Sequence, residues 1–291
     1  MAGCEEITWQ MLLRGAVSDY GVDQSDAMLL LEHASGCSRS EILLHYQEAV
    51  PERVEEHFSE LMEFRMQHIP VQYITGHQNF MGFEFSVTPD VLIPRPETEL
   101  LAERVINACE GKTVLDLCTG SGCIAIAVRL LGKANSVSAS DISEEALAVA
   151  RKNAKTFDAD VLFRQGDLFD AWTSCKDGAQ TETAQEHNTE TFDIIVSNPP
   201  YIPTDEIACL MPEVREYEPM LALDGDEDGL QFYRRIATEC KAYLNPGGKV
   251  FLEIGCEQGK AVAELFRKAG FSDVQIYQDY AGLDRIVEAG I

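Results

Sequence analysis

The sequence has few of the features that mark metal-binding, nucleic-acid-binding or membrane proteins. It has no Cys-x-x-Cys pair, and His187 is its only histidine after His77, so zinc-ligand spacing is absent and we predict no metal site. Lysine and arginine total 23 against 49 aspartates and glutamates, which gives a formal net charge of −26. Nucleic-acid binding relies on basic side chains that neutralise phosphates, so this balance argues against a direct nucleic-acid partner.

Targeting signals and membrane spans are also missing. No apolar run approaches the length of a membrane span, so we expect no membrane contact. The start, MAGCEEITWQ, lacks both the hydrophobic core of a signal peptide and the arginines of a transit peptide. Nine cysteines, an odd number, are typical of a reducing compartment when no signal peptide is present. We therefore expect a cytoplasmic protein.

The amino-terminal part shows the apolar period of helices. Residues 1–75 predict a small helical domain, with Asp26 and Ser38 as helix caps and a helix that starts at Pro51. Thirteen acidic residues and four arginines precede position 70, so this part carries a net charge of −9. Such acidity suits a partner with a basic surface.

In the remaining 216 residues the spacing of apolar side chains changes at two points, near residue 76 and near residue 96. Residues 76–95 alternate apolar and polar side chains, and they predict a β-hairpin connector. Residues 96–291 are the third predicted part, and from residue 112 onward strand-like and helix-like segments alternate, which is typical of an α/β fold with a largely parallel sheet. Residues 171–191 are polar and have no apolar period, so we expect a surface loop there.

A glycine loop lies in VLDLCTGSGCIA, residues 114–125, between a predicted strand and a predicted helix. Gly120 and Gly122 allow a tight turn and a close approach of the backbone to a ligand. Asp141 follows about twenty residues later, which is the spacing of the ribose-binding carboxylate in dinucleotide-binding folds. Nicotinamide enzymes and enzymes that use S-adenosylmethionine are both compatible with this pattern.

Asp116 favours S-adenosylmethionine, because at the end of the strand it can meet the ammonium group of an amino acid. We then expect Asp141 to accept hydrogen bonds from the two ribose hydroxyls. Asp167 and Leu168, in GDLF, are placed to contact the adenine, and for Asp167 a helix N-cap is an equally good interpretation.

The stretch FDIIVSNPPYIP, residues 192–203, predicts a buried strand with an unusual exit. Pro199 and Pro200 have no N–H and a fixed φ, so the exit presents acceptors: the Asn198 side-chain oxygen and the Pro199 carbonyl. Two such acceptors can hold the N–H bonds of a planar NH2 group and stabilise positive charge as its nitrogen is methylated. Tyr201 can stack on that group. We predict Asn198, Pro199 and Tyr201 as the catalytic residues.

The chain resembles the release factor glutamine methyltransferase family over essentially its whole length. The matching segments are LIPRPETE (92–99), DLCTGSG (116–122), VSNPPYI (196–202), EVREYEPMLALDG (213–225), LEIG (252–255) and AGLDRIV (281–287). NPPY alone is shared with adenine-N6 DNA methyltransferases, whereas its combination with RPETE and EYEP is far more specific.

The resemblance implies a seven-stranded Rossmann-like class I methyltransferase sheet behind a small helical bundle that binds the substrate. It implies methylation of the N5 amide of the Gly-Gly-Gln glutamine in class-1 peptide chain release factors, with S-adenosyl-L-methionine as donor. The cofactor-binding residues would be Cys118, Thr119, Gly120, Ser121, Gly122, Asp141, Leu168 and Asn198. The substrate glutamine would contact Asn198, Pro199, Pro200 and Tyr201. We expect a monomer.

Three other functions are compatible with parts of the sequence. An adenine-N6 methyltransferase acting on nucleic acid shares NPPY, although the net charge of −26 opposes it. A non-catalytic binding protein and a nicotinamide oxidoreductase share the glycine loop. Arg95 and Glu97 are compatible both with a helix that starts at a proline and with a role at the site.

Overall fold

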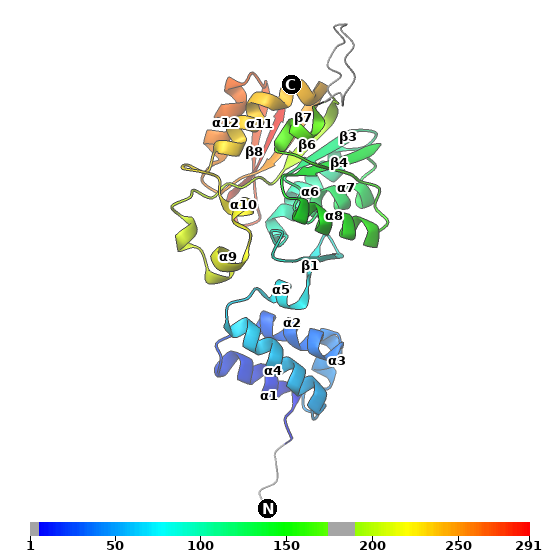
Figure 1. Cartoon of the computed structure of the whole chain (residues 1–291), viewed down its shortest axis with the longest axis vertical. Helices are drawn as coiled ribbons and strands as arrows, with labels where there is room; N and C mark the ends of the chain where they lie inside the picture. Colours follow the sequence, from blue (N-terminus) through cyan, green and yellow to red (C-terminus); the bar gives the residue numbers. More distant parts are fainter. Residues whose placement is uncertain (1–5, 174–189) are drawn as a thin grey trace, which may run out of the picture. The chain divides into compact units, whose positions relative to one another are not determined.

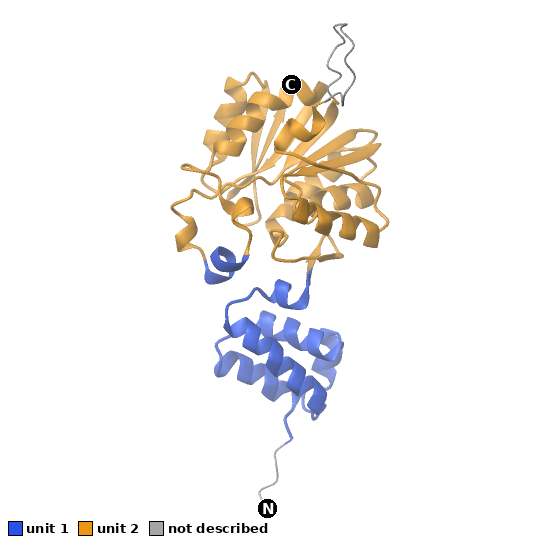
Figure 2. Ribbon diagram, in the orientation of Figure 1, with its two compact units in different colours: residues 1–77, 211–217 blue, residues 78–210, 218–291 orange. Residues whose placement is uncertain are grey.

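The chain divides into two compact units in a computed structural model that describes residues 6–173 and 190–291 (Figure 2). Unit 1 comprises residues 1–77 and 211–217, and unit 2 comprises residues 78–210 and 218–291. No helix within the described ranges combines the length and the apolar character that a membrane crossing requires.

Unit 1 is a helical bundle, as its apolar period predicts. Its helices are α1 (Trp9–Ser18), α2 (Gln24–Ser35), α3 (Arg39–Leu44), α4 (Glu52–Met66), α5 (Val71–Thr75) and α9 (Pro212–Tyr217). Ser38 caps α3 and Pro51 precedes α4, as predicted. The predicted cap at Asp26 was wrong: Asp23 caps α2, and the Asp26 carboxylate accepts from Arg65 instead.

Helix α9 joins unit 1 although it follows α4 by about 150 residues. Glu213 accepts from Nη2 of Arg65 at 2.9 Å, and the Tyr217 hydroxyl donates to the Gln67 carbonyl at 2.6 Å. The Arg65 side chain is 13% exposed and also binds Asp26, so one half-buried guanidinium links three segments. The motif EVREYEPMLALDG is therefore shared: its residues through 217 belong to unit 1 and the rest to unit 2.

Unit 2 is built on the predicted seven-stranded sheet (Figure 1). Strands β3 to β7 pair in parallel, and β9 is antiparallel to both of its neighbours. The order across the sheet is β5-β4-β3-β6-β7-β9-β8. The strands are β3 (Thr113–Leu117), β4 (Ser136–Asp141), β5 (Leu162–Gln165), β6 (Phe192–Ser197), β7 (Leu244–Glu253), β8 (Asp273–Gln278) and β9 (Asp284–Gly290).

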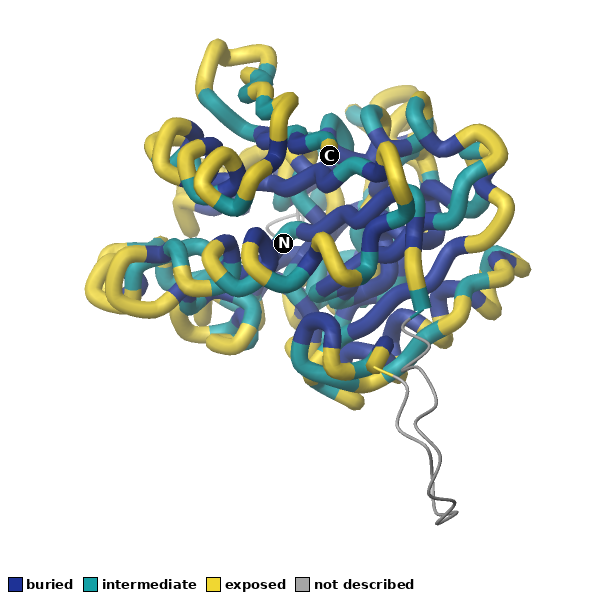
Figure 3. The backbone as a smooth tube through the Cα atoms, turned by 90° about the horizontal axis from the view of Figure 1, so that it is seen from above, coloured by how far each residue is buried: buried dark blue, intermediate teal, exposed yellow. Residues whose placement is uncertain are grey.

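Helices cover both faces of this sheet. The side chains of β6 alternate between two cores, with Ile194 and Val196 in one and Ile195 in the other. Both cores are apolar, as expected for a mainly parallel sheet, and Figure 3 shows the buried backbone gathered in the interior. One face carries α6 (Pro96–Ala108), α7 (Cys123–Leu131) and α8 (Glu144–Thr156), and the other carries α11 (Gln231–Glu239) and α12 (Gly259–Lys268).

The predicted hairpin is present as β1 (His77–Phe80) and β2 (Phe83–Ser86). Phe80 and Phe85 are fully buried and pack with α6 and α7 in the first core. Short helices complete the unit: η1 (Leu168–Trp172), η2 (Ile207–Cys209), α10 (Met220–Leu223) and η3 (Cys240–Tyr243).

The predicted loop 171–191 falls largely outside the described residues, which exclude 174–189. Its first residues do not form the expected surface loop. They complete η1, and Trp172 is only 1% exposed because its indole packs on Phe192 and donates to Ser140.

Candidate active site

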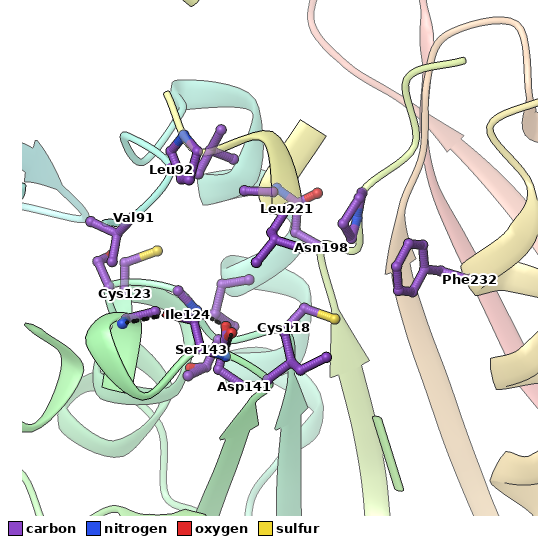
Figure 4. A pocket seen from close by; sticks show the side chains of 18 of the residues that line it. Val91, Leu92, Cys118, Cys123, Ile124, Asp141, Ser143, Asn198, Leu221 and Phe232 are labelled. Atoms are coloured by element: carbon purple, nitrogen blue, oxygen red, sulfur yellow. Dashed lines mark hydrogen bonds between the residues drawn. The ribbon is translucent and has the colours of Figure 1, made fainter. Parts of the chain in front are cut away.

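The carboxyl ends of β5, β4, β3 and β6 lie at one edge of the sheet, because these strands are parallel and adjacent. Ligands bind at this edge in open α/β sheets. A cavity of about 320 Å³ lies here, lined by the four strand exits, by residues of the segment 90–98 before and within α6, by α10 and by α11 (Figure 4).

Most of the predicted site residues meet in this cavity. Four of them are not among the described residues that line the cavity: Asp116, Gly122, Pro199 and Tyr201. Nine form part of the wall: Cys118, Thr119, Gly120, Ser121, Asp141, Asp167, Leu168, Asn198 and Pro200.

The glycine loop after β3 curls through left-handed backbone conformations. Cys118, Gly120 and Gly122 have φ of 57°, 55° and 80°. Gly122 is the N-cap residue of α7, and a Cβ on it would lie 3.1 Å from the side chains of Ala150 and Ile126. Glycine is required at 122 both for its φ and for the close packing of α7 on α8.

Asp116 lies beneath the loop and not in the cavity wall. Its Oδ2 accepts from the Thr119 hydroxyl at 2.6 Å and from the Ala125 N–H at 3.2 Å. Its Oδ1 is buried and has no hydrogen-bond partner among the residues that the structure describes. Burial raises the pKa of Asp116 to about 7, against the opposing effect of these two hydrogen bonds. This carboxyl is a fixed buried acceptor with unused capacity directly under the loop.

Asp141 ends β4 with its carboxylate pointing into the cavity (Figure 4). The Gly120 N–H donates to its Oδ2 at 2.9 Å and the Ser143 N–H to its Oδ1 at 3.0 Å. Burial raises the pKa of Asp141, and these N–H groups partly offset that effect. Each oxygen can accept a further hydrogen bond, so the carboxylate is oriented for a ligand with two donors.

Asp167 follows β5 and forms an ion pair that the sequence did not indicate. Both of its oxygens accept from Nη1 of Arg235, at 2.9 and 3.0 Å. It is the N-cap residue of η1, as one of the two interpretations predicted, but its side chain makes no capping hydrogen bond because its carboxylate binds Arg235. Arg235 also lines the cavity. Nothing in YRRIA distinguishes it from an exposed helical arginine, because its partner is 68 residues away.

Asn198 leaves β6 with its side-chain amide at the cavity. Its Nδ2 donates to the Thr98 hydroxyl at 3.2 Å. Tyr201 turns away: its hydroxyl donates to Oε1 of the buried Glu253 at 3.5 Å, and its ring packs on the second core. Burial raises the pKa of Tyr201 well above its usual value. The stacking role that we assigned to its ring stays a prediction.

The opposite wall brings two sequence motifs together. Arg95 of RPETE donates from Nη2 to Oε1 of Glu218 of EYEP at 2.6 Å. The Glu218 side chain is 1% exposed, and burial raises its pKa against the effect of Arg95. Leu92 lies before α6 and Leu221 lies in α10, and both contribute apolar surface beside Asn198 (Figure 4). Arg95 thus lines the cavity and anchors the segment that carries Leu221.

This strand order, with a glycine loop after β3 and an acidic residue at the end of β4, defines a class I methyltransferase of Rossmann-like fold. Residues 12–76 match a family model described as "PrmC N-terminal domain", and residues 96–211 match "Methyltransferase small domain". A solved methyltransferase from Pyrococcus furiosus has a similar fold, with a TM-score of 0.50 and 20% identity. The aligned region covers 72% of this chain and 89% of the Pyrococcus furiosus chain.

Curated relatives are similar over almost the whole chain. The release factor glutamine methyltransferase of Geobacter sulfurreducens is 38% identical over 277 residues, 94% of this chain and 92% of its own. That of Cereibacter sphaeroides is 41% identical over 273 residues, 92% of both chains. The chain belongs to the release factor glutamine methyltransferase family, and the protein is a methyltransferase.

Proposed function

We propose that the protein methylates the N5 amide nitrogen of the glutamine in the Gly-Gly-Gln motif of class-1 peptide chain release factors, with S-adenosyl-L-methionine as methyl donor. The observation that carries this proposal is the amide of Asn198, which lies in the cavity wall at a strand exit whose next two residues are prolines without an N–H. An amide nitrogen is a weak nucleophile because its lone pair is delocalised. Fixed acceptors compensate for that weakness by orienting the NH2 group and by stabilising its growing positive charge.

The residues at the glycine loop fit the proposed donor. The orphaned Oδ1 of Asp116 supplies an acceptor and negative charge beneath the loop, which suits the amino-acid end of the cofactor. The fixed carboxylate of Asp141 suits the two ribose hydroxyls. Asp167 and Leu168, at the next strand exit, are assigned to the adenine. When bound, the cofactor supplies an electrophilic methyl group on a sulfonium.

Residues at the β6 exit then hold the substrate amide, whose nitrogen accepts the methyl group. The Asn198 side-chain oxygen and the Pro199 carbonyl are assigned to the two N–H bonds of the substrate amide. Pro200 stiffens the exit, so these acceptors keep their positions as charge develops. Apolar side chains such as Leu92 and Leu221 line the same cavity as Asn198.

Unit 1 is assigned to binding of the protein substrate. The residues before position 70 carry a net charge of −9, and release factors act on ribosomal RNA, so basic surfaces on them are expected. Attraction of this kind weakens with salt. The Michaelis constant for the release factor should therefore rise with ionic strength, whereas the affinity for S-adenosyl-L-methionine should change less.

Mass spectrometry of a purified class-1 release factor tests the proposal. After incubation with the protein and S-adenosyl-L-methionine, we expect one added methyl group on the Gly-Gly-Gln glutamine, and none in the same time with Asn198→Ala. An unmodified release factor, with cofactor binding demonstrated, would contradict the proposal. Methylation of adenine in a nucleic acid under the same conditions would establish the alternative activity.

A further inference from the structure

Two amide side chains bind backbone groups of the β3 and β6 exits from outside the cavity wall. Asn153 lies in α8 and Gln258 is the N-cap residue of α12, and these two helices cover opposite faces of the sheet. Neither residue is among the described residues that line the cavity. Any effect that they have on the site must therefore pass through the residues that they hold.

Asn153 binds the glycine loop of the β3 exit. Its Nδ2 donates to the Ser121 carbonyl at 2.9 Å and to the Ser86 carbonyl at 3.0 Å, and its Oδ1 accepts from the Ser86 N–H at 2.9 Å. Asn153 is 1% exposed, and Ser121 lines the cavity. One buried amide thus ties the glycine loop to the end of β2.

Gln258 binds the β6 exit in the same way. Its Nε2 donates to the Tyr201 carbonyl at 2.9 Å and to the Gly229 carbonyl at 3.2 Å, and its Oε1 accepts from the Gly255 N–H at 2.9 Å. A Cβ on Gly255 would lie 2.9 Å from Oε1, and a Cβ on Gly229 would lie 2.6 Å from Nε2. The amide therefore occupies a space that stays open because both of these neighbours are glycines.

The partners fix the orientation of both amides. A backbone N–H only donates and a carbonyl only accepts, so each amide oxygen must face the N–H and each amide nitrogen must face the two carbonyls. A flipped amide would place oxygen against oxygen and lose all three hydrogen bonds. Since both hydrogens of each NH2 group are used, each amide is fully committed to holding its exit.

The two prolines explain why the β6 exit is held at Tyr201. Pro199 and Pro200 have no N–H with which to bind a neighbouring segment. The Pro199 carbonyl is assigned to the substrate amide, so a protein donor at that carbonyl would compete with the substrate. The Tyr201 carbonyl follows directly after the prolines, and a donor there holds the exit without this competition.

We propose that Asn153 and Gln258 are positioning residues, the first for the loop that binds the cofactor and the second for the acceptors that hold the substrate amide. This inference rests on the proposed function, which assigns S-adenosyl-L-methionine to the β3 exit and the substrate glutamine to the β6 exit. Neither residue touches the cofactor or the substrate. Asn153 acts through Ser121, and Gln258 acts through Tyr201.

Alanine substitution of each residue is the matched control for the other, because each substitution removes one amide and three hydrogen bonds to the backbone. Asn153→Ala should raise the Kd for S-adenosyl-L-methionine, measured by calorimetry, about 10-fold, as for one lost hydrogen bond. Its kcat at saturating cofactor should stay within about twofold of the wild-type value. Gln258→Ala should show the reverse, with kcat about 10-fold lower and the Kd within about twofold.

The contrast between the two variants decides between a positioning role and a structural one. A loss of packing alone does not separate cofactor affinity from rate, so the same changes in Kd and kcat in both variants would overturn the proposal. A wild-type Kd in Asn153→Ala would overturn the role of Asn153, and a wild-type kcat in Gln258→Ala would overturn that of Gln258.

Gln258→Glu isolates the donors of the amide. The glutamate keeps an oxygen for the Gly255 N–H, but when ionised it has no hydrogen for the Tyr201 carbonyl and repels it. We expect kcat to fall at least as far as in Gln258→Ala, again with little change in the Kd for the cofactor. A Gln258→Glu variant with the wild-type kcat would show that the donors do not position the exit.

The wild-type protein in the same assays keeps the two proposals distinguishable. A wild-type protein that leaves the release factor unmodified contradicts the proposed function and removes the role of Gln258 with it, whereas the Kd values still decide the role of Asn153. An active wild-type protein beside a fully active Gln258→Ala contradicts the positioning role alone. Circular dichroism confirms the fold of each variant. If Asn153→Ala does not fold, Asn153→Asp replaces it in the calorimetry, because aspartate keeps the shape and the acceptor for the Ser86 N–H.

Discussion

The exits of β3 and β6 lie side by side at the centre of the sheet and have opposite chemistry. The β3 exit has positive φ at Cys118, Gly120 and Gly122, and its backbone offers N–H donors such as that of Gly120, which binds Asp141. The β6 exit consists of Asn198 and two prolines, which have no N–H. The Asn198 amide donates a hydrogen bond to the Thr98 hydroxyl. The glycines let the backbone of the β3 exit approach a ligand closely. The prolines make the backbone of the β6 exit stiff and hold its acceptors in place.

This difference separates two tasks that a methyl transfer requires. The cofactor must be bound tightly through its ribose and its amino acid, which calls for donors, a close approach and a fixed carboxylate. The substrate nitrogen must be oriented while its charge changes, which calls for acceptors that do not move. Substitutions at the β3 side should therefore change affinity or stability, and substitutions at the β6 side should change the rate.

Asn198→Ala should give the largest effect. We expect kcat to fall by about 10² to 10³, the effect of removing one preorganised hydrogen-bonding group from an active site. The Kd for S-adenosyl-L-methionine, measured by calorimetry, should remain close to that of the wild type. A variant with full kcat would break the comparison, because the β6 exit would then have no role in the rate.

Asp141→Ala tests the β3 side. Loss of the carboxylate leaves the ribose hydroxyls and the Gly120 and Ser143 N–H groups without their acceptor, at about 1–3 kcal/mol for such a group. We expect the Kd for S-adenosyl-L-methionine to rise about 5- to 150-fold, with kcat at saturating cofactor reduced far less. Calorimetry gives the first quantity and methyl transfer to the release factor gives the second. An unchanged Kd would remove the ribose assignment.

Gly122→Ala should lower stability, with Gly120→Ala as its matched control. Both residues have positive φ, which costs a non-glycine residue about 1–2 kcal/mol. Only at 122 would the new Cβ meet neighbours, at 3.1 Å, whereas none lies within 4 Å at 120. We expect urea unfolding to show a loss of about 2–4 kcal/mol for Gly122→Ala and about 1–2 kcal/mol for Gly120→Ala. Equal losses would show that α7 can shift to accommodate the methyl group.

The features that the sequence predicts are local ones. The seven strands appear as short segments between turn and helix patterns. The β3 exit appears as glycines after a strand, and the β6 exit as Asn198 before two prolines. Each depends on neighbours within a few residues, so a single sequence is sufficient. The order of the strands then places these exits together, because parallel strands end at one edge.

The features that the sequence does not predict depend on distant partners. Arg235 binds Asp167 across 68 residues, Thr98 binds Asn198 across 100, and Glu213 joins unit 1 through Arg65 across 148. The spacing of charged residues in a sequence does not indicate which distant residue each one will bind. Glu253 is a carboxylate inside the apolar strand KVFLEIG, and this pattern indicates a buried acceptor without identifying its donor, the Tyr201 hydroxyl.

Asp116 gives the smallest and most specific prediction, a pH dependence of stability at the β3 side. Burial raises its pKa to about 7 in the folded protein, above its value in the unfolded chain. The folded state then binds the proton more tightly, so this stabilising contribution is complete below about pH 4 and is lost as the pH rises through 7. Between pH 5 and 8 the free energy of unfolding of the cofactor-free protein should fall more steeply in the wild type than in Asp116→Asn. Parallel curves would mean that Asp116 stays ionised. The charge on the unpaired Oδ1 would then be stabilised in the cofactor-free protein. The β3 exit would in that case have no unused acceptor to distinguish it from the β6 exit.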